Sequence, residues 1–156
     1  MKLLLSLLIC LITFNSIAQK QKVTLEDDTI KVNGISYALI EKRGGMSLDF
    51  RIKSLDGKDL INFQFQEYNN PDKAQSSNPR GRITYYEVSF LNDGQKCETT
   101  SPGTKKGVAK MVVENNLVKD NAVNYEGENS FVMINGMKFS EERKRLNGPN
   151  VIIIER

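Results

Sequence analysis

The 156-residue chain contains no histidine, and its 22 basic residues nearly balance its 19 acidic residues. Because histidine is the commonest general base and metal ligand, its absence excludes a Ser-His-Asp or Cys-His catalytic apparatus and, with only two cysteines, a structural zinc site. The net charge of +3 is too small to indicate a nucleic-acid partner.

Residues 1–18 have the features of a secretory signal peptide. Lys2 supplies the positive charge, the stretch from Leu3 to Phe14 is almost unbroken apolar sequence, and Ser16 and Ala18 occupy the small-residue positions of a cleavage site. The apolar stretch is shorter than the ~20 residues that span a bilayer, which disfavours an uncleaved anchor. We therefore expect cleavage after Ala18, export to the periplasm or the extracellular space, and no integral membrane segment after cleavage.

Cleavage would leave Cys97 as the single cysteine, because Cys10 lies within the signal peptide. An intramolecular disulfide is then impossible, and the alternatives are an inert buried thiol, a disulfide to a partner and a reactive group. Free cysteine is commonly buried, which favours the inert thiol.

The next segments predict a leader followed by a hairpin. Residues 19–28 are polar and are expected to form a flexible leader before a single globular domain over residues 29–156. Thr29–Val32 and Ile35–Lys42 are predicted strands, and the Asn-Gly pair between them favours a type I′ turn.

Three further stretches alternate apolar and polar residues with a period of two, which is typical of strands with one buried and one exposed face. They are "MSLDFRIKSL" from residue 46, "LINFQFQEY" from residue 60 and "RITYYEVSFL" from residue 82, and "QKCETT" adds a short paired strand. Tight turns between them predict an antiparallel meander. The residues expected to face inward in these strands and the first hairpin are Ile35, Tyr37, Leu39, Met46, Leu48, Phe50, Ile52, Ile61, Phe63, Phe65, Thr84, Tyr86, Val88 and Phe90.

Helical spacing appears only in the second half of the chain. Apolar residues over 105–115 predict an amphipathic helix that ends with Asn116 in the left-handed conformation and Leu117 folded back onto Val112. A short helix near 141–146 has acidic residues at its start and basic residues at its end, as the helix dipole favours.

The segments around that short helix predict loop and strand. Residues 119–129 form a predicted polar loop, residues 130–134 a strand followed by an Asn-Gly hairpin turn, and residues 150–156 a closing strand. The whole pattern predicts an α+β fold, mainly an antiparallel β-sheet of about six to eight strands built as a meander of hairpins. One amphipathic helix packs on this sheet, and a short C-terminal helix follows.

No motif predicts a cofactor or a metal. "SPGTKKG" lacks the spacing of a phosphate-binding loop, and an ordinary loop is favoured over an anion site that uses Lys105 and Lys106. The acidic stretches "LEDD" and "DGKD" lack the spacing of a calcium loop. The basic run Arg143–Arg145 is balanced by Glu141 and Glu142, which favours a solvated helix end over a site for nucleic acid or an acidic polymer.

The best candidate surface borders a long loop over residues 69–81. Tyr68, Arg80, Arg82 and Tyr85 flank this loop, and tyrosine and arginine are enriched where proteins bind partners. Such a ledge could dock an unknown protein, peptide or glycan. The alternative is ordinary cross-strand pairing of tyrosines within the sheet.

We therefore expect an exported, non-enzymatic binding protein. One alternative is an enzyme without histidine. It would be a hydrolase with two buried carboxylates in one cleft, or it would use thiol chemistry at Cys97. The other is an accessory subunit of an envelope assembly.

Overall fold

The computed structural model describes residues 21–45 and 48–147. The predicted signal peptide, Met46 and the predicted closing strand over 150–156 lie outside the described residues. Among the described residues, none of the helices combines the length and the apolar character that a membrane span requires.

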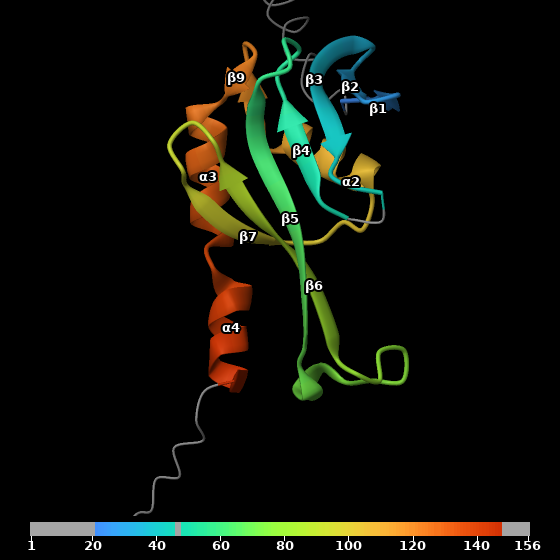
Figure 1. The fold of residues 1–156 in the computed structure, drawn as a ribbon, viewed down its shortest axis with the longest axis vertical. Helices are drawn as coiled ribbons and strands as arrows, with labels where there is room; N and C mark the ends of the chain where they lie inside the picture. The colour runs from blue at the N-terminus through green and yellow to red at the C-terminus, as the bar shows by residue number, and fades with distance from the viewer. Residues whose placement is uncertain (1–20, 46–47, 148–156) are drawn as a thin grey trace, which may run out of the picture.

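A seven-stranded antiparallel sheet forms the body of the protein, and its strands lie side by side in chain order (Figure 1). The strands are β1 (Val23–Glu26), β2 (Thr29–Val32), β3 (Ile35–Lys42), β4 (Phe50–Lys53), β5 (Asp59–Asn69), β6 (Arg82–Phe90) and β7 (Lys96–Thr100). This is the predicted meander, and the α+β fold class is confirmed. β1 falls within residues 19–28, where the sequence predicts a flexible leader, and it pairs with β2 along its whole length.

Helix α2 (Lys105–Glu114) covers one face of the sheet, which we call the core face. Its buried residues are Val108, Ala109, Val112 and Val113. They pack against side chains of the strands, among which Ile30, Ile40, Ile52, Ile61, Phe63, Tyr86, Val88 and Phe90 are almost fully buried. The strands therefore alternate between this core face and a polar face, as the period of two predicts.

Two local turn predictions are confirmed. Asn33 and Gly34 have φ angles of 52° and 86°, the two positive values that a type I′ turn requires. After α2, Asn116 takes a φ of 50°, and the N–H of Leu117 donates to the carbonyl of Val112 at 2.9 Å. This return of the chain closes the end of the helix and buries Leu117 in the core.

The first hairpin buries the opposite set of side chains from the predicted one. Ala38 and Ile40 of β3 are fully buried, whereas Ile35 is 74% exposed and Tyr37 and Leu39 are only half-buried. Both alternate sets of this strand contain apolar residues, so alternation alone does not determine which set faces inward. The pairing with β2 determines the buried set. A bulge between Ile30 and Lys31 shifts the register along β3, so that the buried Ile30 lies opposite Ala38.

Residues 130–134 are helical, which corrects the predicted strand. They lie in α3 (Tyr125–Asn135), which follows the two-stranded pair β8 (Val118–Lys119) and β9 (Ala122–Val123). Gly136 takes a φ of 55° at the end of α3, so the Asn-Gly pair terminates a helix and does not turn a hairpin. Glycine supports both roles, because each needs a positive φ.

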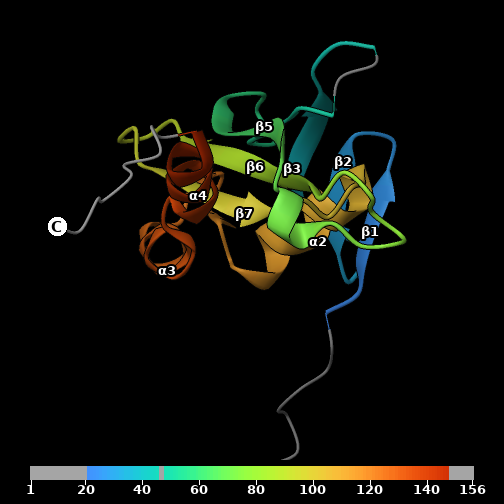
Figure 2. The ribbon, with the colours of Figure 1, turned by 90° about the horizontal axis from the view of Figure 1, so that it is seen from below.

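The last described element, α4 (Lys138–Asn147), begins three residues before the predicted short helix. Figure 2 shows α3 and α4 together at the β7 end of the sheet. The predicted long loop over 69–81 is confirmed to within one residue, since β5 ends at Asn69 and β6 begins at Arg82, and a 3₁₀ turn, η2 (Pro71–Lys73), lies within it. Position 81, at the end of this loop, requires glycine, because a Cβ there would lie 1.8 Å from the carbonyl oxygen of Asn70.

Candidate functional site

The far half of the β5–β6 hairpin projects beyond the sheet. β4 pairs with β5 only as far as Phe63, and β7 pairs with β6 only from Tyr85 onward. Beyond these positions, β5 and β6 continue as a two-stranded ribbon that runs beside α4 (Figure 1). We call this ribbon, residues 64–85, together with α4, the arm.

A buried carboxylate from the sheet holds the start of α4. Glu98 of β7 is fully buried on the face opposite the core. Its Oε2 accepts hydrogen bonds from the backbone N–H groups of Phe139 at 2.8 Å and Ser140 at 2.9 Å, and its Oε1 accepts one from the Ser140 hydroxyl. The first amides of a helix lack partners within the helix, so Glu98 acts as a cap supplied by another element.

Aromatic side chains join the arm helix to the ribbon. Phe139 stacks on Tyr85 with ring centroids 4.8 Å apart, and Tyr85 meets Tyr68 edge to face at 6.1 Å. The Tyr68 hydroxyl donates to Glu142, whose other oxygen accepts from the side-chain amide of Asn70 at 2.8 Å. One side of α4, with Phe139 and Glu142, is therefore committed to holding the helix in place.

The environment of Tyr68 keeps its hydroxyl protonated. Burial raises its pKa above the ordinary tyrosine value, and the hydrogen bond to Glu142 with the charge of that carboxylate raises it further. The proton is needed for the contact, because only a neutral tyrosine donates a hydrogen bond to a carboxylate.

The four residues predicted from the sequence do not form one surface. Tyr68 and Tyr85 share the face beneath α4, and Tyr85 is only 2% exposed. Arg82 is paired with Asn69 in the ladder, so its side chain lies on the opposite face of the ribbon, where it forms an ion pair with Glu67. Arg80 is exposed near the hairpin tip. The tyrosines therefore support α4, and the two arginines lie elsewhere on the ribbon.

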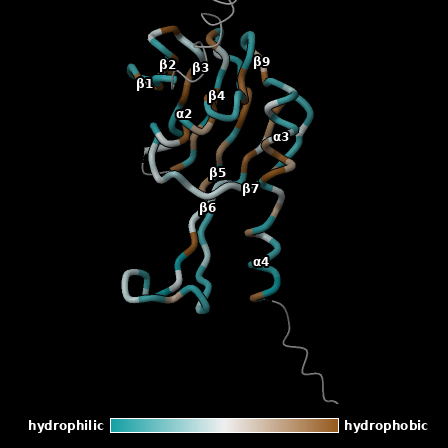
Figure 3. The backbone as a smooth tube through the Cα atoms, turned by 180° about the vertical axis from the view of Figure 1, so that it is seen from behind, coloured by the Kyte–Doolittle hydropathy of each residue, from teal (hydrophilic) through white to brown (hydrophobic). Residues whose placement is uncertain are grey.

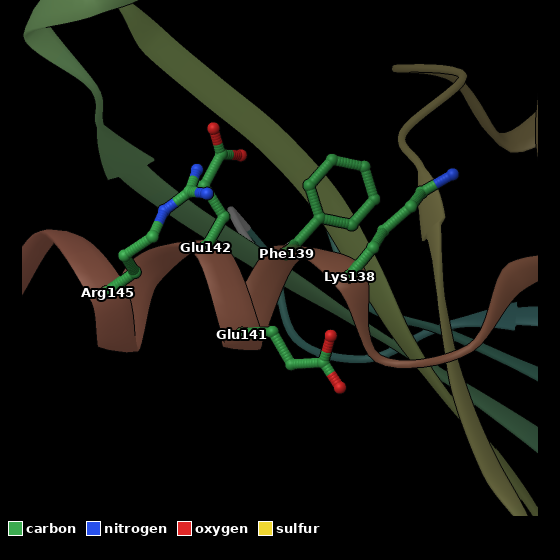
Figure 4. A pocket seen from close by; sticks show the side chains of 5 residues that line it. All are labelled: Lys138, Phe139, Glu141, Glu142 and Arg145. Atoms are coloured by element: carbon green, nitrogen blue, oxygen red, sulfur yellow. The ribbon is translucent and has the colours of Figure 1, made fainter.

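Two shallow pockets lie along α4, one at the edge where the helix meets the ribbon and one on its outer surface. The first, of about 450 Å³, is lined by Lys138, Phe139, Glu141, Glu142 and Arg145. Figure 4 shows Phe139 pointing toward the strands and Glu141 pointing away from them. The second, of about 410 Å³, is lined by Ser140, Arg143, Lys144 and Asn147, which recur at helical spacing along one side of α4.

The four cations of α4 are exposed, and none of them forms an ion pair within the described part of the chain. They are Lys138, Arg143, Lys144 and Arg145. Most cations of the seven-stranded sheet differ from them, since Lys31, Arg51, Lys53, Arg82 and Lys96 each pair with a carboxylate, whereas Lys42 of β3 donates to the carbonyl of Gly45. The outer surface of α4 therefore carries four cations without a carboxylate partner among the residues that the structure describes, beside the exposed carboxylate of Glu141.

Sequence reasoning missed Phe139 and Glu98 as parts of this site. Phe139, Glu142 and Leu146 recur at the spacing of one helical face, a signal that a longer helix prediction would have used. The role of Glu98 has no local signal, because it depends on contacts with residues 41 and 42 positions away.

The geometry of the thiol gives no support for chemistry at Cys97. The side chain is fully buried, and burial raises its pKa to about 12, with a further contribution from the charges of Glu98 and Glu128. A thiol that stays protonated at neutral pH is a poor nucleophile.

The buried carboxyl groups also fail to line a shared cleft. Glu98 caps α4, and Glu128 of α3 accepts a hydrogen bond from Asn92 at 2.7 Å. Burial raises the pKa of Glu128, and the neighbouring carboxylate of Asp93 raises it further. Neither Glu98 nor Glu128 lines the pockets on α4. These two residues therefore do not form the pair of buried carboxylates in one cleft that the hydrolase alternative requires.

Comparisons of the chain with protein-family models, with curated proteins and with solved structures find no match.

Proposed function

We propose that the protein is an exported binding protein that docks a partner on the outer surface of α4. The proposed export is supported by the signal-peptide features of residues 1–18. Export predicts a mature N-terminus at Gln19. N-terminal sequencing of protein recovered from outside the cytoplasm checks this, and recovery of a chain that still begins at Met1 would contradict it.

The observation that carries the binding proposal is the group of four unpaired cations on α4. Positive charge near the end of a helix interacts favourably with the helix dipole, which accounts for Lys144 and Arg145 in the last turn. Lys138 is at the opposite end, where the dipole disfavours a cation. Lys138 lies over the Phe139 ring, with its Nζ 5.2 Å from the ring centroid, and has no carboxylate partner in the described part of the chain. The four cations together suit a partner with negative charge.

The partner that fits this surface best is an acidic polypeptide segment. The pocket with Lys138 and Arg145 also contains the ring of Phe139 and the carboxylates of Glu141 and Glu142. These carboxylates would repel a uniform polyanion such as an acidic polysaccharide. A peptide in which carboxylates alternate with apolar side chains meets both the cations and the aromatic ring.

Replacing all four α4 cations with glutamine tests the proposal. The probe is a fluorescent 12-residue peptide in which glutamate alternates with leucine and phenylalanine, and binding is measured by anisotropy at low and physiological salt. We expect affinity to fall roughly 10- to 100-fold, because exposed ion pairs contribute about 0.2–1 kcal/mol each. The matched control replaces four exposed lysines elsewhere, Lys22, Lys58, Lys106 and Lys119, and should bind like the native protein.

Two outcomes would overturn this assignment. The first is equal binding by the α4 variant and the control variant. The second is tighter binding of the native protein to polygalacturonate than to the peptide at physiological salt, which would make a glycan the partner.

A further inference from the structure

A second surface, between α2 and α3, has the features of an interface. A groove of about 490 Å³ separates α2 from α3, and its apolar lining includes Pro102, Met111, Phe131 and Ile134. Ile134 is 77% exposed, and the adjacent Met133 is 83% exposed. Figure 3 shows the hydrophobic stretches of α3 from behind the molecule. Neighbouring exposed apolar side chains mark interaction sites more often than single ones do.

The charges at the groove favour a second copy of this chain as its occupant. Lys110 and Glu114 line it from α2, one helical turn apart, and both are exposed. Neither forms an ion pair within the described residues. In a twofold interface, the same patch on each copy meets the other, so residue i contacts residue j and residue j contacts residue i. Lys110 and Glu114 suit such an arrangement, because an antiparallel crossing of two α2 helices sets each lysine against the other copy's glutamate.

We propose that the α2–α3 groove is the interface of a homodimer. A twofold axis passes near Met111, the two α2 helices cross antiparallel, and Lys110 of each copy pairs with Glu114 of the other. Ile134 of each copy enters the apolar groove of its partner. This leaves both arms free for the proposed binding function, on which the inference does not depend.

Charge reversal separates this interface from a generic apolar contact. A chain with Lys110→Glu presents two acidic groups at the crossing, and a chain with Glu114→Lys presents two basic groups. Each variant alone should dissociate, with a dimer dissociation constant raised at least tenfold, because both ion pairs become repulsions. An equimolar mixture of the two should recover a 1:1 dimer, and so should the double variant that carries both reversals.

Sedimentation velocity on the purified proteins, over a range of concentrations, distinguishes monomer from dimer. Lys106→Glu makes the same charge change one turn earlier on α2, outside the groove, and should leave the dimer intact. Melting temperatures are recorded for all variants, which alter exposed positions and should remain folded. The proposal is overturned if the native protein stays monomeric at millimolar concentration, if the single reversals remain dimeric, or if mixing them restores no dimer.

Discussion

Replacing Glu98 with alanine is expected to lower the free energy of unfolding by about 3 kcal/mol and to release α4 from the sheet. The substitution removes one carboxylate that accepts from two backbone amides and the Ser140 hydroxyl. Hydrogen bonds to a charged group contribute about 1.5–3 kcal/mol, and the amides would be left without a partner at the start of the helix. The stack of Phe139 on Tyr85 and the hydrogen bonds that Glu142 accepts from Tyr68 and Asn70 would then carry the attachment.

Two measurements separate release of the helix from general destabilisation. Denaturant unfolding gives the change in free energy, and hydrogen exchange shows whether amides of residues 138–147 lose protection while those of β4 and β5 keep theirs. Glu98→Gln retains one acceptor oxygen and should be intermediate. Glu87→Ala removes a carboxylate from the facing position on β6 and should change stability by under about 1 kcal/mol, because its ion pair with Lys96 is exposed. Equal stability of the two alanine variants would refute the capping role.

Replacing Gly127 with alanine should destabilise the protein by about 3 kcal/mol, although alanine is the better helix former by about 1 kcal/mol. A Cβ at this position would lie 2.4 Å from the carbonyl oxygen of Asn116 and 2.7 Å from that of Asn115. Both neighbours are backbone atoms at the end of α2, so no flexible side chain can move aside. The start of α3 would have to shift away from α2, which also alters the groove between the two helices.

Ser130→Ala is the matched control for this substitution. Ser130 is an exposed residue of the same helix, and its replacement should change the free energy of unfolding by less than about 0.5 kcal/mol. Denaturant unfolding of both variants checks the prediction. A Gly127→Ala variant more stable than the native protein would show that helix propensity dominates and that the two helices are not in close backbone contact.

The sheet could be predicted because its signals are local. An Asn-Gly pair sets a hairpin turn through two positive φ angles, and alternation from Ile61 to Phe65 and from Thr84 to Phe90 sets the buried face. The prediction of the buried face was wrong in β3, where both alternate sets contain apolar residues. There a bulge in the pairing with β2 decides which set faces inward, and a bulge is not visible in one strand.

The error at α3 has a different cause. The stretch from Phe131 to Ile134 is rich in residues that favour strands, and Asn-Gly after it is also a hairpin signal. In the structure only one side of this stretch is buried, with Phe131 packed edge to face on Phe90, while Met133 and Ile134 are exposed. Tertiary contact of one helical face therefore prevails over local propensity.

The candidate site could be predicted only in part. The alternation correctly placed Tyr85 on the face opposite Tyr86, but that face is covered by α4 at this point. The position of α4 over Tyr85 depends on Glu98, whose hydrogen-bond partners lie far along the chain. No local sequence pattern therefore reveals that Tyr85 is covered. The basic run at Arg143–Arg145 was visible in the sequence, and only its place on a projecting helix distinguishes it from an ordinary helix end.

The projection of β5 and β6 beyond their neighbours makes the reach of the arm adjustable. Adding or deleting two residues in each strand would keep every side chain on its original face, because side chains alternate with a period of two. Each such step would lengthen or shorten the ribbon by roughly 7 Å without touching the packed interior. The length of the hairpin can therefore change separately from the stability of the body, within the lengths that keep Tyr68 and Asn70 against Glu142 of α4.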